Sequence, residues 1–555
     1  MRLNIVPACF TSLLLFFSSH LFAANSCQIL VNVTGYTAMQ GSKDLTTFNW
    51  LAFNKGKVLS IGRGNWPKQF QSCHSIDGQG QFLLPGLIDA HGHVSSLGNE
   101  MLRVKLRGVL SEQQAVDRVK QFAQNNSQAR WIIGRGWNQV LWLNKAFPSR
   151  RSLDATGIKK PVVLTRIDGH AAWLNSKALA LAGINDATPD PAGGKILRDA
   201  KGKATGILVD NAMNLVAKVM PPNNRIEQEY AFDKAFEHLL SLGITSVHDA
   251  GVSALDLSIY QDRVKQHKLP LRIYGMLEGS SGWLNQWLEQ GHIQDAEDYL
   301  SIRSVKLYSD GALGSRGAAL LAPYADDSDN SGLLLTPPDK LQTLVNQILA
   351  HHFQVNVHAI GDKGNRMVLD SLESAYKKVG GRQQRNRIEH AQIVALDDIP
   401  RFKDLDVIAS MQPTHATSDM NMAGDRLGQK RLKGSYAWQT FLKQGTIVAS
   451  GSDFPVEYAN AFYGLHAAVT RQDRNNQPLK GWRVEEAMTP TQALISFTLN
   501  AAYAAHQEKV IGSLEKGKWA DFILVDRDII NGNPQDIWKT QVLQTWIAGK
   551  LRYKK

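Results

Sequence analysis

The chain has 555 residues, 43% of them hydrophobic and 20% charged, which is typical of a globular protein and excludes a largely disordered one. Its 62 lysines and arginines outnumber 50 acidic residues and give a formal net charge of +12. This excess is scattered apart from the tail after Lys550, and no basic run is interleaved with aromatic residues, so we expect no nucleic-acid partner.

Residues 1–24 read as a cleaved secretory signal. One basic residue, Arg2, precedes a short apolar run interrupted by serines, and small residues follow at Ala23 and Ala24. No other stretch approaches ~20 consecutive apolar residues. We therefore expect a secreted, periplasmic protein with no stable membrane insertion after cleavage; a retained membrane anchor is the alternative.

Removal of the signal takes away Cys9 and leaves two cysteines, Cys27 and Cys73. Because the predicted compartment is oxidising, a disulfide between them is plausible, with two buried free thiols as the alternative.

The two ends of the chain have a similar pattern. Residues 25–80 and 508–555 both show short apolar runs separated by polar turns that contain glycine. We predict that they are two halves of one small β-sandwich domain.

Between these ends, strand-like runs alternate with helical stretches, which indicates a parallel sheet. The candidate strands number eight, as a closed (β/α)8 TIM-like barrel over residues 81–507 requires. They are 87–93, 243–249, 271–276, 304–308, 353–358, 386–390, 407–411 and 446–453.

The segment 105–224 is too long for one connection and is predicted to be an insertion after the first barrel strand. Its residues Trp137, Asp168 and His170 either form a lid over the site or pack the insertion; for Trp137 the packing interpretation is favoured.

A histidine pair ends the first predicted barrel strand. In a strand, residues two apart point to the same face, so His91 and His93 project together while Gly92 turns away. Such a pair suits a metal ion, although two half-buried structural histidines are the alternative.

Four later strands also end in residues able to bind metal: Lys306, His358, His390 and Asp453. Each has an ordinary interpretation by itself, as a core histidine, a surface lysine or a helix cap. Since active sites of barrels form at the carboxyl ends of their strands, the six together predict one metal centre.

The segments PGLIDAHGH, VKLYSDGALGSR, VHAIGD, RIEHAQ and GSDFPV resemble the metal-dependent amidohydrolase superfamily, in particular the branch called amidohydrolase family 3, which includes N-substituted formamide deformylase. The resemblance covers nearly the whole mature chain, including GRGW, RIDGH and the ending GSLEKGKWADFILVD.

The resemblance implies that His91, His93 and Asp453 hold one divalent ion and that His358 and His390 hold a second. Lys306 would bridge both as a carbamate, because carboxylation turns an ammonium into an anionic ligand with two oxygens. Zinc suits these ligands best. If Lys306 stays unmodified, we expect a single metal, with Asp310 as a badly placed substitute.

This chemistry predicts hydrolysis of a C–N bond. A metal ion lowers the pKa of its water from 15.7 to about 7, and Asp453 is expected to take the water proton and pass it to the leaving nitrogen as general acid/base. The candidate substrates are linear N-acyl or N-formyl amines or amino-acid derivatives, rather than peptides. The alternatives are a cyclic amide, ester or lactone hydrolase with the same site, or a binding or regulatory barrel without turnover.

Candidate substrate-binding residues are His170, His415 and Arg316, with His248 and Arg426 as weaker ones; for the histidines a structural role is the competing interpretation. A homodimer is possible, although no residue argues for it.

Overall fold

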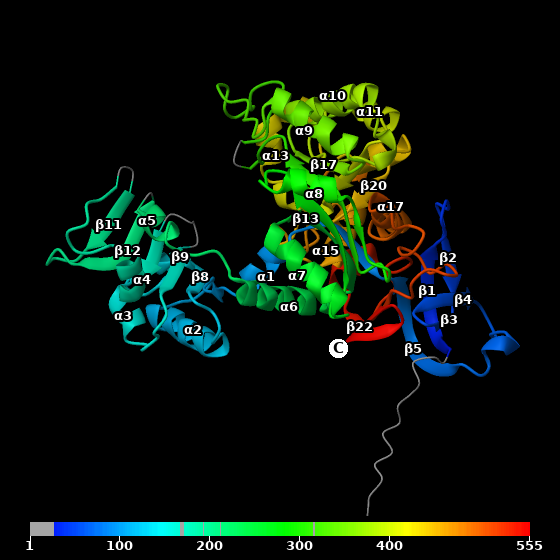
Figure 1. Ribbon diagram of the computed structural model, residues 1–555, viewed down its shortest axis with the longest axis horizontal. Helices are drawn as coiled ribbons and strands as arrows, with labels where there is room; N and C mark the ends of the chain where they lie inside the picture. Colours follow the sequence, from blue (N-terminus) through cyan, green and yellow to red (C-terminus); the bar gives the residue numbers. More distant parts are fainter. Residues whose placement is uncertain (1–26, 167–170, 192–193, 211, 315–316) are drawn as a thin grey trace, which may run out of the picture.

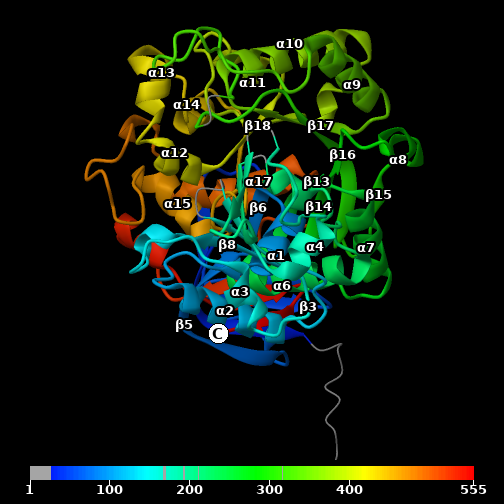
Figure 2. The same cartoon turned by 90° about the vertical axis from the view of Figure 1, so that its left-hand side faces the viewer.

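The computed structural model describes residues 27–166, 171–191, 194–210, 212–314 and 317–555. These residues form a central barrel, a β-sheet built from both chain ends, and an inserted lobe. Figure 1 shows the lobe and the sheet on opposite sides of the barrel, and Figure 2 shows the lobe facing the viewer.

The barrel contains the eight strands that the sequence predicts, in the predicted order. Neighbouring strands pair in parallel in the order β20, β19, β18, β17, β16, β14, β13, β6. A parallel bridge between Gly92 and Phe454 joins the two ends of this sheet, so the expected TIM-like barrel is confirmed. The strands are β6 (Leu87–Gly92), β13 (Ile244–Val252), β14 (Arg272–Glu278), β16 (Leu300–Tyr308), β17 (Gln354–Ala359), β18 (Arg387–His390), β19 (Ile408–Met411) and β20 (Val448–Ser450).

Strand β20 is shorter than predicted. The sequence pattern extends to Asp453, but Asp453 takes a left-handed φ of 59°, and its backbone N–H donates to the His91 carbonyl at 2.7 Å. The chain thus leaves the strand and turns this aspartate toward β6.

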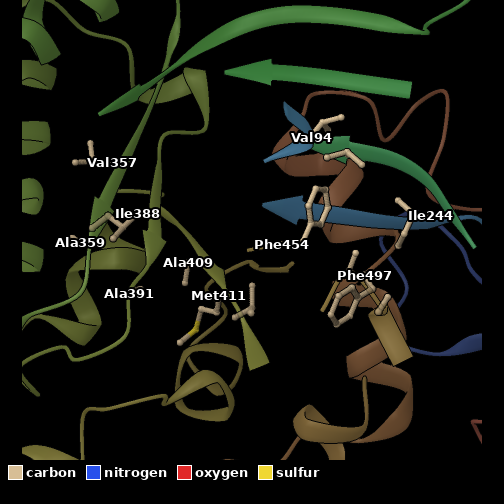
Figure 3. Close-up of a cluster of buried hydrophobic side chains, with 14 of the residues drawn as sticks. Val94, Ile244, Val357, Ala359, Ile388, Ala391, Ala409, Met411, Phe454 and Phe497 are labelled. Carbon is tan, nitrogen blue, oxygen red and sulfur yellow. The ribbon is translucent and has the colours of Figure 1, made fainter. Parts of the chain in front are cut away.

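Helices cover the outside of the barrel, and apolar side chains fill the space between helices and strands. Figure 3 shows part of this core, where Val357 and Ile388 on neighbouring strands and Phe497 lie in one cluster. The helices are α1 (Val94–Met101), α6 (Arg225–Ser241), α7 (Ala254–Lys265), α8 (Leu284–Gln290), α9 (Pro338–Ala350), α10 (Asp362–Lys378), α11 (Ile399–Asp404), α12 (Pro413–Asp419), α13 (Ala423–Leu432), α14 (Trp438–Lys443), α15 (Ala461–Thr470), α16 (Pro490–Ser496) and α17 (Leu499–Ala504).

The inside of the barrel is polar. Many barrels are filled by branched apolar side chains, but here charged and polar side chains of the strands are almost fully buried. They include Asp89, His91, His248, Lys306, Arg387 and Glu389, each at most 1% exposed. Buried charges are costly unless they are paired, so this interior indicates a functional site.

Both chain ends contribute to one sheet, as predicted. Its strands are hydrogen-bonded into a continuous eight-stranded sheet, in which strands from the two chain ends lie next to each other. The reason is β5, which pairs with β1 on one side and with β21 on the other and so joins the two halves. The strands are β1 (Gln28–Ala38), β2 (Leu45–Phe48), β3 (Trp50–Asn54), β4 (Lys57–Gly62), β5 (His74–Pro85), β21 (Phe522–Val525), β22 (Val542–Ile547) and β23 (Lys550–Lys554). The predicted domain boundaries stay predictions.

The predicted disulfide between Cys27 and Cys73 is present. It joins the chain just before β1 to the chain just before β5, two strands that run side by side in parallel. The Cys73 backbone region is also tied by the bond from His74 N to Cys27 O at 2.9 Å.

The insertion forms a six-stranded sheet with its own apolar core. Trp137 is fully buried there and its indole N–H donates to the Leu164 carbonyl at 2.7 Å, which agrees with the packing interpretation. Its strands and helices are β7 (Val104–Lys105), α2 (Glu112–Asn125), β8 (Ile132–Trp137), α3 (Arg150–Asp154), β9 (Val162–Arg166), β10 (Ala171–Leu174), α4 (Ser176–Leu181), β11 (Gly194–Arg198), β12 (Ala204–Asp210) and α5 (Met213–Ala217). A two-residue strand, β15 (Ile293–Gln294), pairs with β16. None of the helices in the described part of the chain has the length and apolar character needed to span a bilayer.

Candidate metal centre

The first predicted ligand pair sits where β6 ends. His91 is fully buried inside the barrel, and His93 follows as the residue before α1. Their ring centroids are 5.4 Å apart. Burial first, and then the charge of Lys306, lower the pKa of His91 to about 4. His91 is therefore neutral at pH 7 and keeps a nitrogen lone pair for a metal.

Asp453 lies between the histidines. The His93 Nε2 atom donates to Asp453 Oδ1 at 3.0 Å, and His91 Nε2 is 3.6 Å from the same oxygen. Burial opposes ionisation of Asp453, but the hydrogen bond from His93 and the nearby His91 and His415 hold the pKa of this carboxyl well below its usual range. The group is thus an anion in the folded protein.

Lys306 reaches the same place from β16. It is 1% exposed, and its Nζ atom donates to His91 Nε2 at 3.1 Å. Burial lowers its pKa to about 8. Among the described residues, no carboxylate lies within ion-pair distance of this amine, which is unusual for a buried lysine.

The second predicted pair, His358 and His390, comes from the ends of β17 and β18. Their ring centroids are 4.5 Å apart, and the His390 ring is 4.9 Å from that of His91. Burial, followed by the charge of Lys306, lowers the pKa of His358 to about 3, and burial holds the pKa of His390 well below its normal value. His358 Nε2 is buried and has no hydrogen-bond partner.

His415, predicted as a substrate-binding residue, lies deeper in the site than that role requires. It stands on α12, and its Nε2 atom is 3.6 Å from Asp453 Oδ2. Its ring stacks on that of His390 with centroids 5.7 Å apart. The position is therefore compatible with either a metal or a substrate carbonyl.

The residues fit a divalent metal. One ligand atom from each of His91, His93 and Asp453 lies within 4.8 Å of the others, and the same is true of His390, His415 and Asp453. Neutral imidazoles and a carboxylate are ligands that zinc accepts. The His358 Nε2 atom, which is buried without a hydrogen-bond partner, also suits a metal ligand.

Two residues in this site adopt strained backbone conformations. His390 has a φ of 77° and Asp453 a φ of 59°. Such conformations are uncommon for residues with a side chain and cluster at functional sites. His390 ends β18 and Asp453 follows the end of β20 at Ser450, and both side chains face the common centre.

Asp310, expected to be a badly placed substitute ligand, has an Oδ1 atom 3.9 Å from His358 Nε2, but its oxygens are engaged by other groups. Its oxygens accept backbone N–H groups from Ala319, Ile360 and Gly361 and the Ser309 hydroxyl. This carboxylate therefore anchors loops. Burial raises its pKa to about 6.

The other predicted substrate-binding residues either have partners away from the predicted ligands or lie outside the described residues. Arg426 forms an ion pair with Asp326, and His248 accepts a hydrogen bond from Arg387 deep in the barrel at 2.8 Å. His170, Asp168 and Arg316 lie outside the described residues.

Sequence reasoning missed the residues that support the ligands. Glu389 accepts from His91 Nδ1 at 2.5 Å, and Gln412 accepts from His390 Nδ1 at 2.7 Å. Asp89 accepts from the backbone N–H groups of His91 and Ser452 and so ties β6 to the loop that carries Asp453. One signal was available: two charged residues, 387 and 389, recur with period two in a strand that must be buried on both faces.

A cavity of about 670 Å³ lies between the inserted lobe and the rim of the barrel. Its barrel-side lining includes Ser95 on α1, Ser253 before α7 and Pro455 after β20, which all follow carboxyl ends of barrel strands. Trp131 and Met220 of the insertion form part of the opposite wall. The cavity is large enough for a small-molecule ligand and lies on the face where barrel enzymes bind substrates.

Comparison with known proteins agrees with this geometry. The model of the amidohydrolase family matches residues 75–553. Protein LONG AFTER FAR-RED 3 of Arabidopsis thaliana is 34% identical over 539 residues, which cover 94% of this chain and 91% of the relative. N-substituted formamide deformylase of Arthrobacter pascens is 27% identical over 497 residues, 86% of this chain and 90% of the relative.

Among solved structures, an uncharacterized metal-dependent hydrolase from Pyrococcus furiosus matches with a TM-score of 0.76 and 30% identity, covering 91% of this chain and all of the other. The chain therefore belongs to the amidohydrolase family and is a metal-dependent hydrolase of carbon–nitrogen bonds.

Proposed function

We propose that this protein is a secreted, periplasmic enzyme that hydrolyses the amide bond of a linear N-acyl or N-formyl amine or amino-acid derivative. Water is added across the C–N bond, so the products are a carboxylic acid and an amine. The observation that carries the proposal is the position of Asp453, whose two oxygens lie within 3.6 Å of His91, His93 and His415.

We propose two zinc ions as the metals of this site, because imidazole and carboxylate ligands suit zinc. The residues that would hold them are His91, His93 and Asp453 for one ion and His358 and His390 for the other. When bound, such ions would make water acidic enough to lose a proton near neutral pH and would polarise the amide carbonyl.

Lys306 is suited to act as a carboxylated bridging ligand. The buried amine has a pKa of about 8, so about a tenth of it is uncharged at pH 7. The uncharged amine would add to CO2: an N–C bond would form as one C–O π bond opens, and the surplus amine proton would pass to water, which leaves a carbamate anion. The amine nitrogen lies 3.1 Å from His91 Nε2, beside the predicted ligands.

Asp453 is placed to move the proton. As an anion held by His93, it can accept a proton from the attacking water and later donate it to the leaving nitrogen. His415, on the far side of Asp453, is placed to donate a hydrogen bond to the substrate carbonyl. The cavity of about 670 Å³ beside the barrel rim offers room for the acyl or amine part.

Secretion is supported by the N-terminal sequence and by the disulfide. Cys27 and Cys73 are bonded, and such bonds persist in oxidising compartments. Removal of the N-terminal segment during export, read by N-terminal sequencing of the protein recovered from a periplasmic fraction, is the expected result; an intact Met1 in the cytoplasmic fraction would contradict it.

The central test is a substrate screen with the zinc-loaded protein. N-acyl amines, formamides, dipeptides, cyclic amides, esters and lactones would be offered in parallel, and we expect turnover of linear amides. Lys306→Ala and Asp453→Asn should each lower this turnover by about 10²-fold or more. Preference for esters or lactones would favour the alternative substrate classes. Less than one metal per chain, together with activity that survives both substitutions, would contradict the metal mechanism.

A further inference from the structure

A buried carboxylate, that of Glu389, binds the Nδ1 side of the His91 ring. The ring Nδ1 atom lies 2.5 Å from Glu389 Oε2, and both side chains are fully buried. A carboxylate accepts hydrogen bonds, so the proton of the neutral ring is on Nδ1. The lone pair of Nε2 is thereby directed toward Lys306 and Asp453, at 3.1 and 3.6 Å.

Glu389 is itself held in place by Arg387. The Arg387 Nε atom lies 2.7 Å from Glu389 Oε1, and its Nη2 atom donates to Oε2 at 3.0 Å. The same Nη2 atom donates to the Ala90 carbonyl at 2.6 Å and to the Ser410 hydroxyl at 2.8 Å. Because Ala90 precedes His91, this arginine orients both the carboxylate and the strand segment that carries the ligand.

Among the described residues, the histidines of the other metal position have no carboxylate within hydrogen-bond distance. His390 Nδ1 donates to the Gln412 side-chain carbonyl at 2.7 Å, and His358 Nε2 has no hydrogen-bond partner, with Asp310 Oδ1 3.9 Å away. A carboxylate that accepts the ring proton fixes the imidazole and raises its basicity as a ligand more than a neutral amide does. The histidines in the two halves of the site therefore differ in basicity and in how firmly their rings are oriented.

We propose that Glu389, oriented by Arg387, is a positioning residue for His91, and that it makes the metal position at His91 and His93 the tighter of the two. This inference rests on the proposed binuclear centre. It predicts that the apoprotein takes up its first zinc ion at His91, His93 and Asp453, and that the ion at His358 and His390 exchanges more readily.

The test is zinc binding by the full mature chain after chelator treatment. Zinc alone would be titrated against a chromophoric chelator, with bound metal counted by elemental analysis. We expect two steps in the wild type. In Glu389→Gln the tighter step should weaken about 10–100-fold while the weaker step changes little, which is the usual range for loss of a partner behind a metal ligand. Gln412→Leu should instead affect the weaker step.

The matched control is Asp521→Asn. Asp521 is also a buried carboxylate paired with a fully buried arginine, Arg272, which lies at the opposite, amino end of a barrel strand. This substitution removes a comparable ion pair away from the site. It should lower stability without changing either zinc step. If Glu389→Gln changes both steps no more than Asp521→Asn does, Glu389 has only a structural role and the inference is wrong.

A crystal of the wild-type protein with one zinc equivalent keeps the inference testable even if the variants fold poorly. Anomalous density at His91 and His93 supports it, and density at His358 and His390, or equal occupancy of both, overturns it. These readouts do not depend on catalysis. Unequal zinc binding without hydrolysis of any amide would contradict the proposed function but not this inference.

Discussion

The centre of the barrel and the centre of the inserted lobe bury different kinds of side chain. At the barrel centre, fully buried positions hold charged or titratable groups such as His91, Arg387 and Glu389. In the lobe, the centre holds three indole rings, those of Trp137, Trp142 and Trp173, which are at most 2% exposed and lie 6.2 to 6.4 Å apart.

This difference separates the chemistry of the molecule from part of its stability. Buried charges lower stability unless every partner is in place, whereas buried aromatic rings stabilise a fold without chemical roles. We therefore expect substitutions in the barrel interior to abolish activity or metal binding. Substitutions in the core of the lobe should unfold the lobe and leave the metal centre intact.

The largest effect should come from Asp453→Asn. An amide cannot accept the water proton, so hydrolysis of the best amide substrate should fall about 10²–10⁴-fold, the usual contribution of a general acid/base. Asp528, in the loop after β21, accepts a hydrogen bond from the Tyr36 hydroxyl on β1 at 2.7 Å, and Asp528→Asn is a control that should retain activity. Full activity in Asp453→Asn, measured as kcat, would show that the barrel centre works without this carboxylate.

The corresponding change in the lobe is Trp137→Ala. It removes a fully buried ring and the indole donor to Leu164, so we expect a loss of about 3–5 kcal/mol in the free energy of unfolding of the lobe. Hydrogen exchange of β8 and β9 measures this loss. Zinc stoichiometry should stay as in the wild type; a loss of zinc would mean that the two regions are not separable in this way.

Removal of metal should destabilise the barrel and leave the lobe unchanged. Zinc at 100 times its dissociation constant stabilises the state that binds it by about 2.7 kcal/mol. Chelation should therefore accelerate hydrogen exchange in β6 and β18 but not in β8 and β9. Equal acceleration in both regions would indicate that lobe and barrel unfold as one unit.

The smallest expected effect is a change of folding stability with pH. Burial, and then the charges of Arg303 and Arg385, lower the pKa of His506 to about 4. Because this folded pKa is below that of the unfolded chain, near 6.5, the unfolded state binds more protons as the pH falls. Stability is full above about pH 6.5 and is lost down to about pH 4, by ~1–3 kcal/mol.

Acid pH should destabilise the barrel more than the lobe, since the only histidine between residues 105 and 224 is His170. Denaturant unfolding of the metal-free protein at several pH values, followed by exchange in each region, tests this. His506→Gln should reduce the acid slope of the barrel by the share of one histidine, since His91, His358 and His390 also have lowered pKa values. An unchanged slope would assign the acid sensitivity to other groups.

Much of the metal centre follows from local patterns. His91 and His93 share a face because strand residues alternate, and Lys306, His358 and His390 were located because each ends an apolar run of strand length. The eight strands were found for the same reason. Their order in the closed barrel then places these ends on one face.

The sequence pattern was less informative about the end sheet and the supporting residues. Strand β5 pairs with strands from both ends, and no local pattern shows that its two edges are both occupied. Gln412 gave no signal, because an amide after an apolar run is common, and its role depends on a contact with a histidine on a different strand.

By itself, therefore, the sequence determined which residues are able to bind metal and that they stand at strand ends, because both properties depend on side-chain chemistry and short-range periodicity. Only the tertiary structure decided how those ligands are oriented. His91 and Glu389 are separated by 298 residues and meet at 2.5 Å because the barrel closes and sets the register of β6 and β18. The character of each half of the site depends on such contacts between distant strands, since a hydrogen bond requires geometry that no single strand contains.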